Sequence, residues 1–245
     1  MRLKYKIYRY YYNYFMRFIG NSFLGIRIKW NIALFFVGLE FHEQNLKTKK
    51  KFSHYLDPRM PLQKELQELI PQCEKKETIR ILDLGAGPIS KVGKICKGRK
   101  IELIPLDPLA DKYCKLLKDN DIQPPVYPIV GYGDKLSKMF SKNTFDLIHM
   151  RNSLDHTKNP MVIIFEMLKV LKLNHYIYLN HYINEGENTN YYGLHLWNFL
   201  IKNKDFVIQN KNKKISYNVT QKLKKIAIVN TKPINNRLIV TIKKN

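Results

Sequence analysis

The chain has 245 residues, of which 44% are hydrophobic, and it carries a formal net charge of +23. This length and apolar content suit a single α/β domain with an extension, and they exclude a chain that is disordered throughout. Its three cysteines lack C-x-x-C spacing, which argues against a disulfide framework or a zinc knuckle and favours a reducing compartment.

The positive charge lies mainly at the two ends of the sequence. Residues 1–60 hold 12 basic and 3 acidic side chains, residues 181–245 again hold 12 and 3, and residues 61–180 hold 19 and 14. A basic surface can bind nucleic acid, an anionic membrane or a phosphorylated substrate. The joint abundance of Lys, Asn, Ile and Tyr fits an AT-rich genome equally well, so the charge by itself assigns no partner.

Residues 1–56 are predicted to form a basic, aromatic and helical N-terminal extension. Residues 1–18 interleave basic and aromatic side chains, and residues 19–38 are largely apolar but contain Arg27 and Lys29, which makes them a poor membrane span. No signal-peptide pattern is evident, so we expect a cytoplasmic protein. The extension either packs on the main domain, where it could cover a pocket, or makes a peripheral contact with the inner membrane face.

Residues 57–245 are predicted to form the main domain, in which helices alternate with short apolar strands. Helices are expected at 57–72, 89–96, 109–118 and 160–173, and strands at 78–84, 101–106, 126–130, 145–150, 175–181, 206–210 and 238–243. This alternation indicates an α/β class, Rossmann-like fold: a doubly wound, mostly parallel sheet with helices on both faces.

A glycine-rich turn follows the first predicted strand, where residues 82–88 have the sequence LDLGAGP. Glycines at a strand end let the backbone approach a ligand closely, and the next predicted helix would offer its N-terminal amides. Ser90 stands where a pyrophosphate-binding motif has its third glycine. The turn therefore favours a nucleoside cofactor that has no pyrophosphate.

A second acid, Asp107, follows Asp83 by 24 residues, at the end of the next predicted strand. A carboxylate in this place can accept hydrogen bonds from both ribose hydroxyls of a nucleoside. The pattern LDLGAGP…DP resembles the class I S-adenosylmethionine-dependent methyltransferases, and the resemblance extends over residues 79–180. It implies S-adenosylmethionine as the cofactor, bound by Asp83, Gly85, Ala86, Gly87, Asp107 and Pro108.

Further cofactor contacts are implied after the third and fourth strands. Residues 131–136 have the sequence GYGDKL, where the family has a G-D-G-E-K-L-like segment whose acid contacts the adenine amino group. Tyr132 replaces that acid, so either Asp134, which follows Gly133, takes over the role or Tyr132 itself contacts the adenine. In the family the loop after the fourth strand borders the transferred methyl group, which implies that Arg151 and Asn152 lie near the cofactor.

Polar clusters are expected at the carboxyl ends of the strands, where open α/β sheets bind ligands. An alcohol acceptor must lose a proton as the new bond forms, and histidine is suited to accept it. We therefore expect His156 as the catalytic base, or His181 as the second choice, oriented by Asp155 or Glu185. The residues predicted to contact the substrate are Asn184, Glu185, His195, Trp197 and Asn198.

Three short segments narrow the resemblance. NSLDH at 152–156, HYINE at 181–185 and GLHLWNF at 193–199 are similar to N-A-L-D-H, H-x-x-N-E and G-L-H-Q-W-N-F in a subgroup of bacterial methyltransferases, often encoded near cell-surface polysaccharide genes. The resemblance implies O-methylation of a small molecule or of a glycan intermediate in polysaccharide biosynthesis.

Other functions stay open at this point. RNA could be methylated with the help of the basic ends, although the chain lacks the Asp/Asn-Pro-Pro-aromatic and Pro-Cys motifs of base-modifying enzymes. A non-catalytic protein with the same fold could bind a membrane or a partner. The histidines show no H-x-x-x-H or H-E-x-x-H spacing, so no metal is expected. The oligomeric state is not determined by the sequence.

Overall fold

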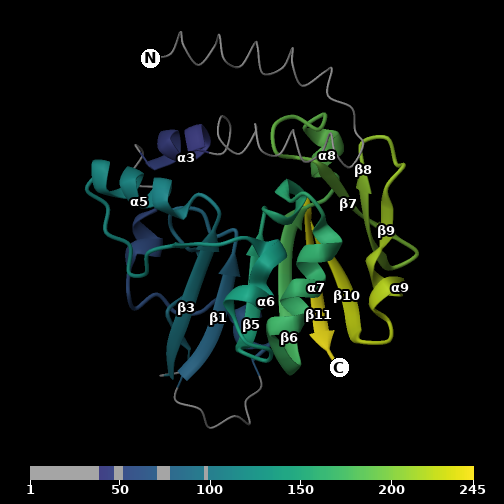
Figure 1. Ribbon diagram of the computed structural model, residues 1–245, viewed down its shortest axis with the longest axis horizontal. Coiled ribbons are helices and arrows are strands. Elements are labelled where there is room, and N and C mark those ends of the chain that lie inside the picture. The colour runs from purple at the N-terminus through teal and green to yellow at the C-terminus, as the bar shows by residue number, and fades with distance from the viewer. Residues whose placement is uncertain (1–38, 47–51, 71–77, 97–98) are drawn as a thin grey trace.

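The computed structural model describes residues 39–46, 52–70, 78–96 and 99–245 (Figure 1). The predicted membrane-contacting segment at 1–38 lies outside the described residues. Of the predicted extension, the structure describes α3 (Leu39–Leu46) and the short 3-10 helix η3 (Ser53–Leu56). None of the described helices is long and apolar enough to cross a membrane.

A mixed, mostly parallel sheet of eight strands forms the centre of the molecule (Figure 1). The strand order is β10-β11-β6-β5-β1-β3-β2, and β4 also pairs with β3. The four adjacent strands β3, β1, β5 and β6 are all parallel, whereas β11 is antiparallel to both β6 and β10. The strands are β1 (Thr78–Leu84), β2 (Ile95–Cys96), β3 (Arg99–Asp107), β4 (Ile129–Val130), β5 (Phe145–Arg151), β6 (Leu171–Tyr182), β10 (Ala227–Ile234) and β11 (Arg237–Lys244).

Both faces of the parallel strands are covered, which explains their almost continuous apolar sequences. One face packs on α7 through a core that includes Leu82, Ile148 and Met167. The opposite face packs on the segment around α4, where Leu62 and Leu66 lie against the strands. Helix α4 (Lys64–Gln67) precedes β1, and the helices between strands are α5 (Ala110–Asp119), η4 (Gly133–Lys135), α6 (Leu136–Met139), η5 (Leu154–His156), α7 (Pro160–Val170) and α8 (Glu185–Asn188).

A second, antiparallel sheet of three strands lies beside β10 at the edge of the main sheet (Figure 1). It contains β7 (Trp197–Lys202), β8 (Asp205–Asn210) and β9 (Ser216–Asn218), and α9 (Val219–Leu223) follows it. Its buried side chains, including Phe199 and Phe206, join the core beneath α7. This small sheet therefore fixes the segment just before β7, and that segment contains His195.

The Rossmann-like α/β fold with a mostly parallel sheet is confirmed. Strands β1, β3, β5, β6, β8 and β11 lie where strands were predicted, and α5 and α7 lie at the predicted helices 109–118 and 160–173. The predicted strand 126–130 is shortened to β4. Strands β2, β7, β9 and β10 were not predicted.

The predicted helix 57–72 forms only the single turn α4 among its described residues. Pro61 forms an isolated bridge with Ile95, and the Leu62 backbone N–H donates to the Ile95 carbonyl over 2.8 Å. These bonds to β2 fix the start of the segment in an extended conformation, so the helix begins late.

The predicted helix 89–96 is also wrong. Gly93 packs so tightly that an added Cβ would lie 2.3 Å from the Pro61 carbonyl oxygen. The Gln63 side chain donates to the Lys91 carbonyl and accepts from the Gly93 N–H. Because these backbone groups bond to the preceding segment and not to one another, no helix follows the glycine-rich turn, and the expected helix N-terminus is absent there.

Candidate functional site

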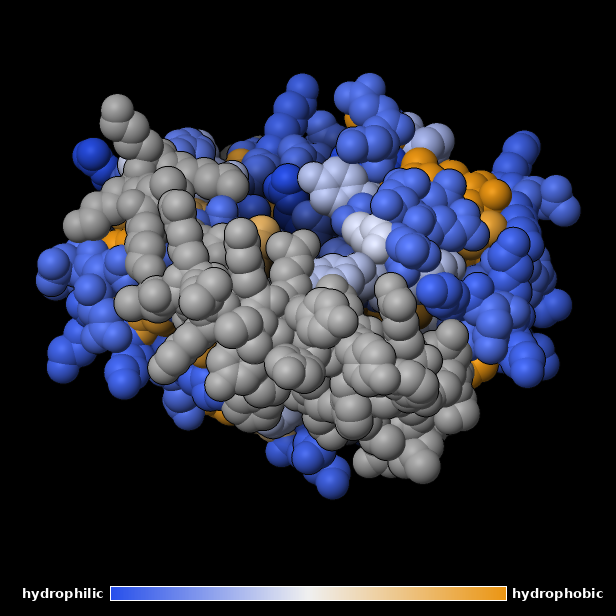
Figure 2. Space-filling view, turned by 90° about the horizontal axis from the view of Figure 1, so that it is seen from above, coloured by the Kyte–Doolittle hydropathy of each residue, from blue (hydrophilic) through white to orange (hydrophobic). Residues whose placement is uncertain are grey.

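A cleft of about 880 Å³ opens at the carboxyl ends of the parallel strands. In Figure 1 this is the upper edge of the sheet, next to α3 and α8. Every residue predicted to contact the cofactor lines the cleft, as do Asp155, His156, His181, Glu185 and His195. Figure 2 looks onto this edge and shows that the described side chains there are mainly hydrophilic, with smaller hydrophobic patches.

The glycine-rich turn forms one wall of the cleft. Gly85 and Gly87 have φ angles of +70° and +67°, which side chains other than hydrogen rarely adopt. A Cβ on Gly85 would lie 2.4 Å from the Ser153 hydroxyl, and one on Gly87 would lie 3.1 Å from the His42 ring. The turn thus needs glycine for both its conformation and its close packing.

Asp83 is buried at the end of β1, where it is held by two side chains. Ser90 donates its hydroxyl to one carboxylate oxygen over 2.6 Å, and Nδ1 of His149 lies 2.7 Å from the other. The His149 ring also stacks on Tyr178, with ring centroids 5.9 Å apart. A carboxylate has about four lone-pair sites, so Asp83 keeps acceptor capacity toward the cleft.

Asp107 is buried at the end of β3. Its two oxygens accept hydrogen bonds from the backbone N–H groups of Gly87, over 3.1 Å, and Leu109, over 2.9 Å. Burial raises the pKa of Asp107 to about 6, although these two hydrogen bonds act in the opposite direction. The side chain is therefore largely ionised at neutral pH and keeps lone pairs for further donors.

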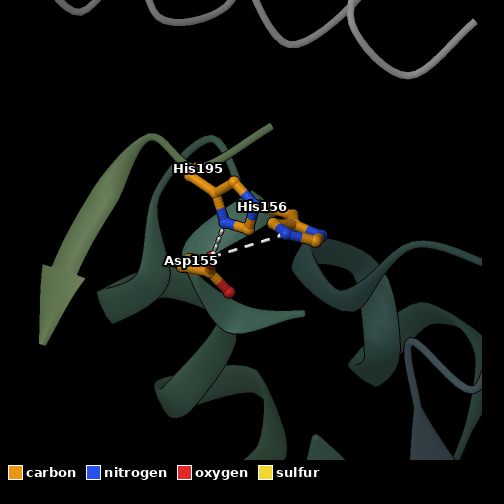
Figure 3. A group of neighbouring side chains, drawn as sticks. All are labelled: Asp155, His156 and His195. Carbon is orange, nitrogen blue, oxygen red and sulfur yellow. Dashed lines mark hydrogen bonds and ion pairs between the residues drawn. The ribbon is translucent and has the colours of Figure 1, made fainter. Parts of the chain in front are cut away.

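A cluster of Asp155, His156 and His195 lies on another wall of the cleft (Figure 3). Nδ1 of His195 lies 2.7 Å from Oδ2 of Asp155, and Nε2 of His156 lies 3.4 Å from the same oxygen. On its other side, Nε2 of His195 lies 3.9 Å from Glu185. Asp155 and His156 are on η5, whereas His195 comes from the segment before β7, so the cluster forms only when the second sheet docks.

The surroundings of Asp155 and His195 favour the anionic form of the first and raise the basicity of the second. Burial would raise the pKa of Asp155, but the charges of His156 and His195 and the hydrogen bond from His195 lower it to about 2. Burial lowers the pKa of His195, yet its hydrogen bond to Asp155 and the charges of Asp155 and Glu185 outweigh this and raise it. Because an ionised carboxylate can only accept, Nδ1 of His195 must carry the proton.

The two histidines predicted as bases have other environments. Burial lowers the pKa of His156, and its Nε2 is buried without a hydrogen bond. Burial also lowers the pKa of His181 to about 3, and neither of its ring nitrogens has a hydrogen-bond partner. Asp155 therefore makes its hydrogen bond with His195 and not with His156 or His181, the two histidines that the sequence analysis paired with it.

Three of the residues predicted to contact the substrate, Asn184, Trp197 and Asn198, are not among those that line the cleft. Trp197 is fully buried and donates its indole N–H to the Thr157 carbonyl over 2.7 Å. Asn198 is buried, and its amide donates to the side chain of Asn184 over 3.2 Å. These side chains instead fix the segment that carries His195.

Two histidines of the cleft were missed by the sequence analysis. His42 of α3 packs on Gly87 and edge-to-face on Tyr113, and burial lowers its pKa to about 4. His149 pairs with Asp83. A histidine inside the apolar strand 145–150 was an available signal for His149, whereas nothing in the local sequence marks His42.

The Asp155, His156 and His195 cluster also has the composition of a metal site. One donor atom from each lies within 4.8 Å of the others, and two histidines with a carboxylate are a known ligand set. The expectation that no metal is bound came from local spacing, which could not anticipate a donor brought from residue 195. The Asp155–His195 hydrogen bond accounts for this pair without an ion.

Comparisons with known proteins give weak similarities. No protein-family model matches the chain, and no curated protein sequence is similar to it. A SAM-dependent methyltransferase from Aquifex aeolicus is 16% identical, with 82% of this chain and 96% of that chain covered and a TM-score of 0.46. A structure described as a SAM-dependent methyltransferase from Methanosarcina mazei is 15% identical, with 76% and 99% covered and a TM-score of 0.43. Similarities at this level assign no activity.

Proposed function

We propose that the protein is an S-adenosylmethionine-dependent methyltransferase that methylates a hydroxyl group of a small molecule or of a glycan intermediate. The observation that carries the proposal is the Asp155–His195 pair, which shares one cleft with the Gly85–Gly87 turn and Asp107. The pair can accept a proton, and the turn and the acid suit a nucleoside without a pyrophosphate.

The residues of the cleft fit this cofactor. Its volume of about 880 Å³ lies within the range of small-molecule sites. Asp107 would accept hydrogen bonds from the ribose hydroxyls with the lone pairs that its backbone donors leave, and Asp83 would meet the ammonium group. Tyr132 and Asp134 both line the cleft, so either can contact the adenine. The cofactor would supply the methyl group.

The chain's own contribution is to hold the acceptor and remove its proton. With Nδ1 of His195 donating to Asp155, Nε2 is the nitrogen left free to accept the hydroxyl proton. The resulting imidazolium would be stabilised by the anionic Asp155 on one side and by Glu185 on the other. His195 thus replaces His156 and His181 as the proposed base, and Asp155 keeps the orienting role predicted for it.

Calorimetric titration with S-adenosylmethionine and S-adenosylhomocysteine tests this proposal. We expect micromolar binding, which corresponds to about 8 kcal/mol. Asp107→Ala should weaken binding at least roughly 10-fold, because it removes a charge-assisted hydrogen-bond acceptor. Asp111→Ala is the matched control, because it removes the same charge from α5 at a residue outside the cleft lining.

Two outcomes would contradict the proposal. If the folded protein bound neither ligand, the non-catalytic alternative would replace it, and membrane or partner association would be measured instead. If binding were unchanged in Asp107→Ala, the ribose contact would be wrong. Steeply salt-dependent binding of RNA, with methyl transfer to it, would favour the nucleic-acid alternative.

A further inference from the structure

Two arginines lie close together at the carboxyl edge of the sheet. Arg151 is the last residue of β5, Arg237 is the first residue of β11, and β6 lies between these strands. In the β6 pairings, Asn180 is opposite Arg151 and Tyr182 is opposite Arg237. Arg151 and Tyr182 both line the main cleft.

The guanidinium of Arg237 is held in one orientation. Its Nε donates to the Asn180 side-chain oxygen over 2.7 Å, and its Nη2 donates to that oxygen and, over 2.6 Å, to the Asn180 backbone carbonyl. The guanidinium carbon lies 4.1 Å from the centre of the Tyr182 ring, a cation–π contact. The remaining nitrogen, Nη1, is buried and has no hydrogen-bond partner.

Neither arginine forms an ion pair with an acid among the residues that the structure describes. The pKa of Arg237 is lowered by burial and then by the positive charge of Arg151. Two neighbouring positive charges, of which Arg237 is fixed by Asn180 and Arg151 is exposed, form an arrangement suited to an anion.

A smaller cavity of about 230 Å³ lies beside Arg151 and Asn180, the residue that holds Arg237. Arg151 and Asn180 line it, and so do His54, Lys91 and Tyr178. Arg151 lines both this cavity and the main cleft, so it connects the two. The lining holds one acid, Glu65, against the cations of Arg151 and Lys91, so positive charge is in excess there. Guanidinium and ammonium groups are the donors that recognise phosphate and carboxylate groups.

We propose that Arg151, reinforced by the fixed positive charge of Arg237 beside it, binds an oxoanion of the acceptor, either a phosphate or a carboxylate group. This inference rests on the proposed function, and it narrows the substrate class from any hydroxyl compound to an acidic one. Glu185 links the two sites, because it lies 3.9 Å from Nε2 of His195 and its charge acts on Arg237. An acceptor held by its oxoanion would therefore place a nearby hydroxyl beside His195.

The test uses the full chain and two simple probes, inorganic phosphate and acetate, at constant ionic strength so that general screening does not change. We expect saturable binding of at least one probe by calorimetry or thermal shift, and the tighter probe identifies the oxoanion. Arg237→Gln and Arg151→Gln should each weaken it at least roughly 10-fold. Arg80→Gln is the control, because it removes the same charge from the opposite end of the parallel strands, where Arg80 pairs with Glu102.

The inference would be overturned if neither phosphate nor acetate bound saturably. It would also be overturned if Arg151→Gln, Arg237→Gln and Arg80→Gln all lost the same amount of affinity for the probe. If Arg237→Gln failed to fold, as judged by circular dichroism, the exposed Arg151 would still provide the test. S-adenosylmethionine titration of Arg237→Gln separates this inference from the proposed function. Loss of phosphate or acetate binding with unchanged cofactor affinity supports the anion site, whereas cofactor binding without any anion site leaves only the proposed function standing.

Discussion

His181→Phe should make the protein more resistant to acid. The His181 side chain is buried, and its ring packs edge-to-face on Phe199 with centroids 5.0 Å apart. Both ring nitrogens lack a hydrogen-bond partner. Burial lowers the pKa of His181 to about 3, because a charged imidazolium would be desolvated there and repelled by Arg237, while Asp155 offsets this only in part.

The sign and the size of the effect follow from linkage between protonation and folding. In the unfolded chain, His181 binds a proton near pH 6.5, whereas the folded state excludes that proton until about pH 3. The free energy of unfolding therefore falls as the pH falls through this window, by at most about 1.4 kcal/mol per pH unit. The full cost at the acid end is roughly 4 to 5 kcal/mol. Phenylalanine does not titrate, and it removes the unsatisfied nitrogens as well.

Urea denaturation between about pH 7.5 and pH 4 measures the difference. We expect the free energy of unfolding of His181→Phe to fall less steeply than that of the wild type below pH 6.5. His42, whose pKa burial lowers to about 4, should account for part of the remaining slope. Equal slopes for the two proteins would refute the reasoning. Methyl transfer that survives in His181→Phe would also exclude His181 as the catalytic base.

Three further substitutions test the site and the fold. His195→Gln should lower the rate of methyl transfer by about 10²- to 10⁴-fold while cofactor affinity stays unchanged, and an unaltered rate would exclude His195 as the base. In the wild type the rate should rise with pH through the raised pKa of His195, since only the neutral ring accepts a proton. Gly93→Ala should lower the free energy of unfolding by about 1 to 3 kcal/mol in urea denaturation, because the alanine Cβ would lie 2.3 Å from the Pro61 carbonyl oxygen. A variant as stable as the wild type would contradict this close contact. Trp197→Phe should lower the free energy of unfolding by about 1 to 3 kcal/mol in the same measurement, because the fully buried indole loses its hydrogen bond to the part-buried Thr157 carbonyl and part of its packing. Wild-type stability would contradict this role.

The two predicted helices at 57–72 and 89–96 show where local pattern fails. Both segments have helical spacing of apolar side chains, yet hydrogen bonds between them leave only the turn α4 in the first and no helix in the second. Gly93 lies against the backbone of Pro61, a contact between residues far apart in the sequence. Helical periodicity describes one element at a time, so it cannot predict such a contact.

The glycine-rich turn and the two acids could be identified from the sequence because each lies at the end of an apolar strand, and strand ends of a parallel sheet meet at one edge. The pairing of Asp155 with His195 could not be identified, because their positions are brought together by β7 and the second sheet. The same holds for Arg151 and Arg237, which become neighbours only when β11 joins β6 in antiparallel register. Local sequence thus determined most of the strands and the cofactor half of the cleft. Long-range packing decided that His195 pairs with Asp155, that His181 is buried without a hydrogen bond, and that Arg151 and Arg237 lie near each other.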